Sequence, residues 1–89
     1  MKEPYLEVTY RHGRPLAAYY YLPRDADEQP VRSRRAQPGL IVDYSAAGTP
    51  IGIEITAPSQ ITLEALNALL SELNMSALGK ADFAPLHAA

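Results

Sequence analysis

Two carboxylates are the residues of this chain whose types and spacing first suggest chemistry. Asp43 and Glu54 lie in two short stretches of alternating apolar residues, 40–45 and 50–56, on either side of a segment that contains Gly48. In a paired hairpin both side chains fall on the same face. Two neighbouring carboxylates can bind a cation or share a proton. The alternative that they are outward-facing polar residues is favoured, because an oxygen-ligand metal site needs more ligands than one pair supplies.

Tyrosines and arginines form the second candidate surface. Tyr19 and Tyr21 point to the same side of a predicted strand. With Arg32, Arg34 and Arg35 they could form a stacking and phosphate-binding platform for single-stranded nucleic acid. The formal net charge of −2 at neutral pH argues against a strongly nucleic-acid-binding chain. We therefore expect the tyrosines to pack over the sheet with their hydroxyls at its rim.

The remaining residue types give little support for an active site. The chain has no cysteine, and its only imidazoles, His12 and His87, stand apart in a presumed turn and tail, so a zinc site has almost no support. The glycines are isolated, which excludes a phosphate-binding loop. We expect a protein that is not an enzyme and that binds no metal or cofactor. An unfamiliar catalytic site around Asp43 and Glu54 is the enzymatic alternative.

Five strands and one helix are predicted to position these side chains. Alternating, β-branched and aromatic residues predict the strands, at residues 5–11, 16–22, 31–37, 40–45 and 50–56. The strand at 31–37 suits the edge of a sheet, where its three arginines discourage unwanted pairing. Leucines recur at helical spacing over 63–73, behind Thr62 as N-cap, with Asn74 and Gly79 as the two candidate terminators. These elements predict an α+β fold: an antiparallel sheet of four or five strands with one C-terminal helix packed on a face.

The same hairpin permits a prediction of register. If residues 45–48 form a four-residue loop that ends in a left-handed glycine, Val42 lies opposite Ile51. Leu40 then lies opposite Ile53. A slip by one residue would set apolar side chains against polar ones, so the pattern favours the four-residue loop.

Length and apolar pattern set the domain organisation. The 89 residues suit one small domain, predicted to be a single α+β domain over 1–79. Residues 80–89 have no clear period, and we expect a loosely ordered tail from which Phe83 and Leu86 could dock. A sheet with apolar residues on both faces exceeds what one short helix covers, which predicts a homodimer. Apolar runs far shorter than the roughly 20 residues of a membrane helix predict a soluble, cytoplasmic chain.

The sequence of the hairpin and its flanks resembles that of a known protein family. Its distinctive positions are Pro38, Gly39, Asp43, Tyr44, Gly48, Gly52, Ile53, Glu54, Ile55 and Ser59. They resemble the motif of a family of small bacterial proteins known as domain of unknown function 2283. The resemblance implies a small, β-rich fold without an assigned activity, in which the motif residues are structural positions. Some members resemble partners of neighbouring toxin-like genes, which makes an antitoxin-type role conceivable.

These observations favour a small bacterial non-enzymatic protein-interaction module, with an antitoxin-like role as its narrower form. A nucleic-acid-binding regulatory protein that uses the three arginines of residues 31–37 is the alternative. The possible binding surface consists of Tyr19, Tyr21, Arg32, Arg34, Arg35, Asp43 and Glu54.

Overall fold

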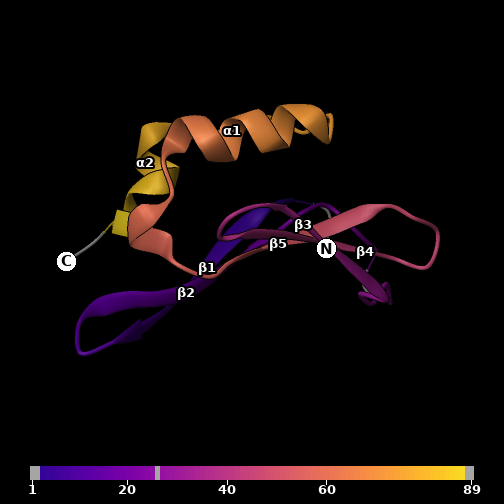
Figure 1. Cartoon of the computed structure of the whole chain (residues 1–89). Coiled ribbons are helices and arrows are strands. Elements are labelled where there is room, and N and C mark those ends of the chain that lie inside the picture. Colours follow the sequence, from indigo (N-terminus) through magenta and orange to yellow (C-terminus); the bar gives the residue numbers. More distant parts are fainter. Residues whose placement is uncertain (1–2, 26, 88–89) are drawn as a thin grey trace.

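The chain forms one antiparallel sheet with two helices on one side of it, as Figure 1 shows. The computed structural model describes residues 3–25 and 27–87. Its elements are β1 (Tyr5–Arg11), β2 (Arg14–Tyr21), β3 (Arg32–Gln37), β4 (Leu40–Tyr44), β5 (Pro50–Ile55), the 3-10 turn η1 (Pro58–Gln60), α1 (Leu63–Glu72), α2 (Lys80–Phe83) and the 3-10 turn η2 (Ala84–His87). The predicted α+β fold with a helix after the strands is confirmed.

The strand order is β1-β2-β5-β4-β3, so that β1 and β3 lie at the two edges. The turn between β1 and β2 places His12 at φ 53° and Gly13 at φ 77°, and this pair of left-handed residues matches the twist of the two strands. Pro38 and Gly39 make the tight turn between β3 and β4, with Gly39 at φ 84°. The prediction of an arginine-bearing edge strand is confirmed.

The β4–β5 register differs from the prediction by two residues. Val42 lies opposite Ile53 rather than Ile51, and Leu40 lies opposite Ile55. The connecting loop spans residues 45–49, and the register is irregular between Asp43 and Tyr44. A shift by two residues leaves every side chain on its own face, so the apolar pattern cannot distinguish the two registers.

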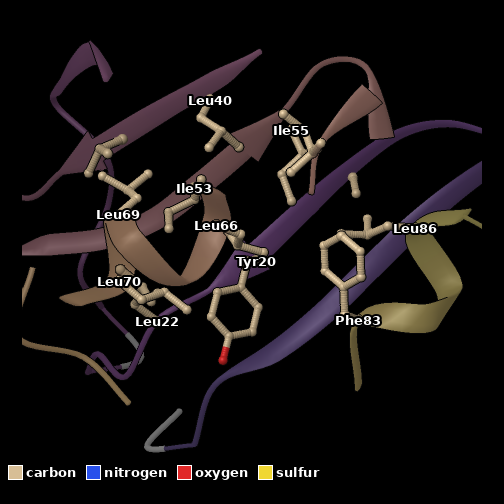
Figure 2. Packing of buried hydrophobic residues seen from close by; sticks show 13 residues of the cluster. Tyr20, Leu22, Leu40, Ile53, Ile55, Leu66, Leu69, Leu70, Phe83 and Leu86 are labelled. Atoms are coloured by element: carbon tan, nitrogen blue, oxygen red, sulfur yellow. The ribbon is translucent and has the colours of Figure 1, made fainter. Parts of the chain in front are cut away.

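The core lies between the sheet and the helices (Figure 2). It is built of Ala18, Tyr20, Leu22, Leu40, Val42, Ile53, Ile55, Ile61, Leu66, Leu69, Leu70, Phe83 and Leu86. Alternate residues of β2, β4 and β5 point to this side, as the sequence predicts. Each fully buried leucine or isoleucine contributes about 1.5–3 kcal/mol to stability.

Helix α1 has the ends that its sequence predicts. Thr62 Oγ1 accepts a hydrogen bond from the backbone N–H of Ala65 at 3.0 Å. Asn74, at φ 60°, ends the helix in the left-handed conformation, and the N–H of Met75 donates to the carbonyl of Leu70 at 2.8 Å. In the described part of the chain, no helix has the length and apolar character needed to cross a membrane.

The C-terminal segment is helical over the residues that the structure describes, which corrects the expectation of a loosely ordered tail. Residues 80–87 form α2 and η2, and both Phe83 and Leu86 are buried in the core. The ring of His87 contacts the carbonyl of Ile61 at 2.7 Å. The apolar contacts of Phe83 and Leu86 therefore hold this segment. Two apolar residues are too few to produce a helical period in the sequence, so the pattern did not predict the helix. Residues 88–89 lie outside the described part.

Candidate functional site

Figure 1 shows that the helices lie over one face of the sheet and leave the other face open. Most of the chemically distinctive side chains lie on this open face. Strand pairing aligns them in two rows across the sheet. The first row is Arg35, Ile41, Glu54, Tyr19 and Glu7. The second row is Ser33, Asp43, Gly52, Tyr21 and Tyr5. We call this surface the uncovered face.

Asp43 is the buried centre of the uncovered face. Its side chain is only 4% exposed, although it belongs to the face without helices. Tyr19 Oη donates to Asp43 Oδ2 at 2.9 Å, and Ser33 Oγ donates to Asp43 Oδ1 at 2.6 Å. Both carboxylate oxygens thus have a hydroxyl donor, which offsets the cost of removing them from water. The two donors come from strands on opposite sides of Asp43.

Gly52 leaves the space through which Tyr19 reaches Asp43. It lies opposite Asp43 on one side and Tyr21 on the other. A Cβ atom built on Gly52 would overlap the hydroxyl and ring of Tyr19. The glycine is therefore required by the close approach of a neighbouring side chain and not by the conformation of its own backbone.

Glu54 forms a carboxyl pair with Asp43. A hydrogen bond to Asp43 raises the pKa of Glu54, and partial burial and the charge of Asp43 raise it further. The pKa of Tyr19 is also raised, first by burial and then by its hydrogen bond to Asp43, so Tyr19 stays protonated and remains a donor. The pair can share a proton, as the sequence allowed.

Three tyrosine rings extend the uncovered face toward β1. Tyr5 and Tyr21 stack with ring centroids 4.5 Å apart, and Tyr19 meets Tyr21 edge-on at 4.7 Å. Tyr21 Oη donates to Glu7 Oε1 at 3.1 Å. The guanidinium of Arg24 lies 5.2 Å from the Tyr21 ring centroid, in cation–π geometry. The tyrosines therefore pack against one another and against the carboxylates, as the favoured alternative expects, but the Tyr19 hydroxyl reaches the buried Asp43 and does not lie at the rim of the sheet.

The structure divides the arginines that the sequence analysis grouped together. Arg32 and Arg34 lie on the helix-side face, beside Tyr44, and only Arg35 shares the uncovered face with Tyr19. Strand alternation separates position 35 from positions 32 and 34, so this division could have been read from the sequence. The platform of Tyr19, Tyr21 and three arginines, which was the less favoured alternative, is thus not assembled.

The candidate residues of the sequence analysis do not include four participants in these contacts, which are Tyr5, Glu7, Arg24 and Ser33. Tyr5 and Glu7 join the face of Tyr19 and Tyr21 through the pairing of β1 with β2. Arg24 follows β2 in an irregular segment, where no periodicity indicates its direction. Ser33, in β3, lies opposite Asp43 of β4. The alternation of side chains along β3 could have indicated that Ser33 points to the same face as Asp43.

A shallow depression lies next to the carboxyl pair. It has a volume of about 380 Å³, and its lining includes Glu7, Ala17, Tyr19, Glu54 and Thr56. Ala17 is smaller than the residues around it, so the surface is lower there. Because two carboxylates border the depression, it suits a positively charged side chain. Within residues 3–25 and 27–87, no three His, Cys, Asp or Glu side chains are grouped so that they could hold a metal ion.

Comparison with known proteins gives one finding. No curated protein and no solved structure matches the chain. Residues 17–58 match the family model described as protein of unknown function DUF2283. This segment contains Tyr19, Ser33, Asp43, Gly52 and Glu54, whereas Tyr5, Glu7 and both helices lie outside it. Residues 17–58, just under half of the chain, therefore match the DUF2283 family, as the resemblance of the hairpin predicts.

Proposed function

We propose that this protein is a non-enzymatic protein-interaction module and that two copies associate through the uncovered face. The observation that carries the proposal is the order of side chains in the first row, which has Arg35 at the β3 end and Glu7 at the β1 end. Turning a second copy about an axis parallel to the strands places Arg35 of each protomer against Glu7 of the other. The same rotation sets Ile41 against Tyr19, so that the row complements itself.

Rigid aromatic side chains support an interface at this face. Tyr19 is held by Asp43, and Tyr21 is held between Tyr5, Glu7 and Arg24. Side chains that are fixed before association lose little conformational entropy when a partner arrives. The fixed positions of these tyrosine side chains therefore support a protein–protein interface at this face.

The size and charge of the face set the strength of the proposed dimer. Five strands about 4.8 Å apart and about six residues long present roughly 500 Å² per protomer, at the small end of specific interfaces. At the middle of the row the two Glu54 side chains meet, and their repulsion grows as they ionise. We expect a weak, concentration-dependent dimer that weakens as the pH rises.

A charge exchange tests the proposal. Sedimentation velocity over a concentration series should show dimers of the wild type, and Glu7→Arg or Arg35→Glu alone should shift the dissociation constant upward at least tenfold. The double variant Glu7→Arg/Arg35→Glu should restore association, because it reverses both ends of the pair. Arg32→Glu is the matched control, since its side chain lies on the other face.

Three results would reject this dimer. They are a wild type that stays monomeric at millimolar concentration, a double variant that fails to recover, or an equal loss in Arg32→Glu. An antitoxin-like role is the narrower form of the proposal, in which a further partner is a toxin. It is suggested by the family resemblance alone.

A further inference from the structure

Strand β3 offers a free backbone edge. It pairs with β4 on one side, and in the described part of the chain no strand lies on its other side. In an antiparallel pair, alternate residues of an edge strand direct their N–H and C=O groups away from the partner. Residues 32–35 of this strand are all exposed. Another extended segment could therefore pair with it.

Arginines border this edge on both faces of the sheet. Arg34 donates from Nε and Nη2 to Tyr44 Oη at 3.2 and 3.1 Å. The guanidinium of Arg32 lies 5.5 Å from the centroid of the same ring. Arg35 lies on the opposite face, across from Ile41. Tyr44, in the neighbouring strand β4, thus holds the guanidinium groups of two β3 arginines in place, which lowers the entropy lost when they bind carboxylates.

We propose that β3 binds an extended acidic segment of another protein, which joins the sheet as a sixth strand. Backbone hydrogen bonds along the edge would supply the attraction common to any strand, and the arginines would select carboxylates. A basic segment, or the β3 of a second copy, would instead set like charges side by side. The edge shares Arg35 with the uncovered face, but the backbone groups, Arg32 and Arg34 do not take part in the proposed dimer, so this proposal does not depend on it.

The residues just before β3 restrict where such a segment can lie. Asp27 and Glu28 line a depression beside Val31, just before the strand. Val31 itself is 63% exposed. An acidic segment is repelled at this end, where an apolar side chain can cover Val31. We therefore expect the carboxylates of the partner to lie along residues 32–35.

A titration followed by amide NMR tests this proposal. The probe is a capped nine-residue peptide of alternating Glu and Thr. We expect shifts of amide signals at residues 31–37 and slower hydrogen exchange in β3. A Lys and Thr peptide of the same pattern should not bind. The acidic peptide with a central proline should bind at least tenfold more weakly, because proline cannot complete the pairing.

Matched variants locate the binding. Arg32→Gln/Arg34→Gln should weaken binding of the acidic peptide about 2- to 30-fold, as expected for two surface ion pairs. Arg11→Gln/Arg14→Gln makes the same change of charge at the β1–β2 turn and should leave binding unchanged. Glu7→Arg, which should weaken the dimer at least tenfold, should bind the peptide as the wild type does.

Four outcomes would overturn the proposal. They are no binding of the acidic peptide at millimolar concentration, shifts confined to another surface, equal binding of the proline peptide, or equal weakening by the control variant. A nine-residue oligothymidylate that shifted the same amides at lower concentration than the peptide would assign the edge to nucleic acid instead.

Discussion

Each face of this sheet has deeply buried side chains, but the two faces bury them by different means. On the helix side, Leu40 and Val42 are fully buried against aliphatic side chains. On the uncovered face, the neighbouring Asp43 is almost as deeply buried, but by a tyrosine, a serine and the adjoining strands. Apolar contacts tolerate many arrangements, whereas a buried carboxylate needs particular donors at particular distances. The covered face therefore supplies stability, and the uncovered face has the side chains whose positions are specified.

The largest expected effect is the loss of unfolding free energy when a buried side chain is truncated, and it should differ between the two faces. Leu70→Ala should lower the free energy of unfolding by about 2–5 kcal/mol, because it leaves a cavity in a fully buried site. Ile41→Ala, on the uncovered face, should cost about 1 kcal/mol or less, since its side chain is partly exposed. Urea unfolding of both variants measures the difference. Equal losses would mean that the uncovered face is as important to folding as the core.

A smaller effect tests whether Tyr19 needs the space above Gly52. Gly52→Ala should cost about 1–3 kcal/mol, because its methyl group displaces the tyrosine from Asp43. In a Tyr19→Ala background the same substitution should cost much less, and a double-mutant cycle measures this coupling. Gly79→Ala is the control, since a Cβ there meets no atom within 4 Å. Additive losses would contradict the proposed contact.

The fold could be predicted from the sequence because its signals are local. Alternation, turn glycines and the leucine spacing located the strands and α1, and Thr62 and Asn74 marked the helix ends. The hairpin register could not be obtained in the same way, since a shift by two residues conserves every face. Gly52 shows what decides it: the observed register sets the glycine opposite Asp43, where it makes room for Tyr19.

Some members of the candidate site could be predicted from the sequence, but their contacts could not. Alternation placed Asp43 with Glu54 and Tyr19 with Tyr21, and each pair does share a face. The bond between Tyr19 and Asp43 crosses β5, which lies between strands that are distant in sequence. Sequence patterns indicate which way a side chain points, but strand order depends on the packing of the whole sheet.

The smallest effect concerns the carboxyl pair and is seen in pH dependence. The pKa of Glu54 is raised in the folded protein above its ordinary value of 4.5. Below that value Glu54 is protonated in both states. As the pH rises from there through the folded pKa, the unfolded chain loses its proton first, so this group makes unfolding progressively easier. Glu54→Gln should therefore gain stability relative to the wild type as the pH rises.

The comparison is made as a difference between two unfolding free energies, because other carboxylates titrate in the same range. Chemical unfolding from pH 4 to pH 8, at concentrations below the dimer range, measures it. Glu64→Gln, on the exposed side of α1, controls for the loss of one negative charge. In an Asp43→Asn background the pH dependence of the Glu54→Gln effect should shrink, because the charge of Asp43 and its role in the pair are removed. If the effect kept its full pH dependence there, burial alone would account for the behaviour of Glu54, and the two carboxylates would be neighbours that do not share a proton.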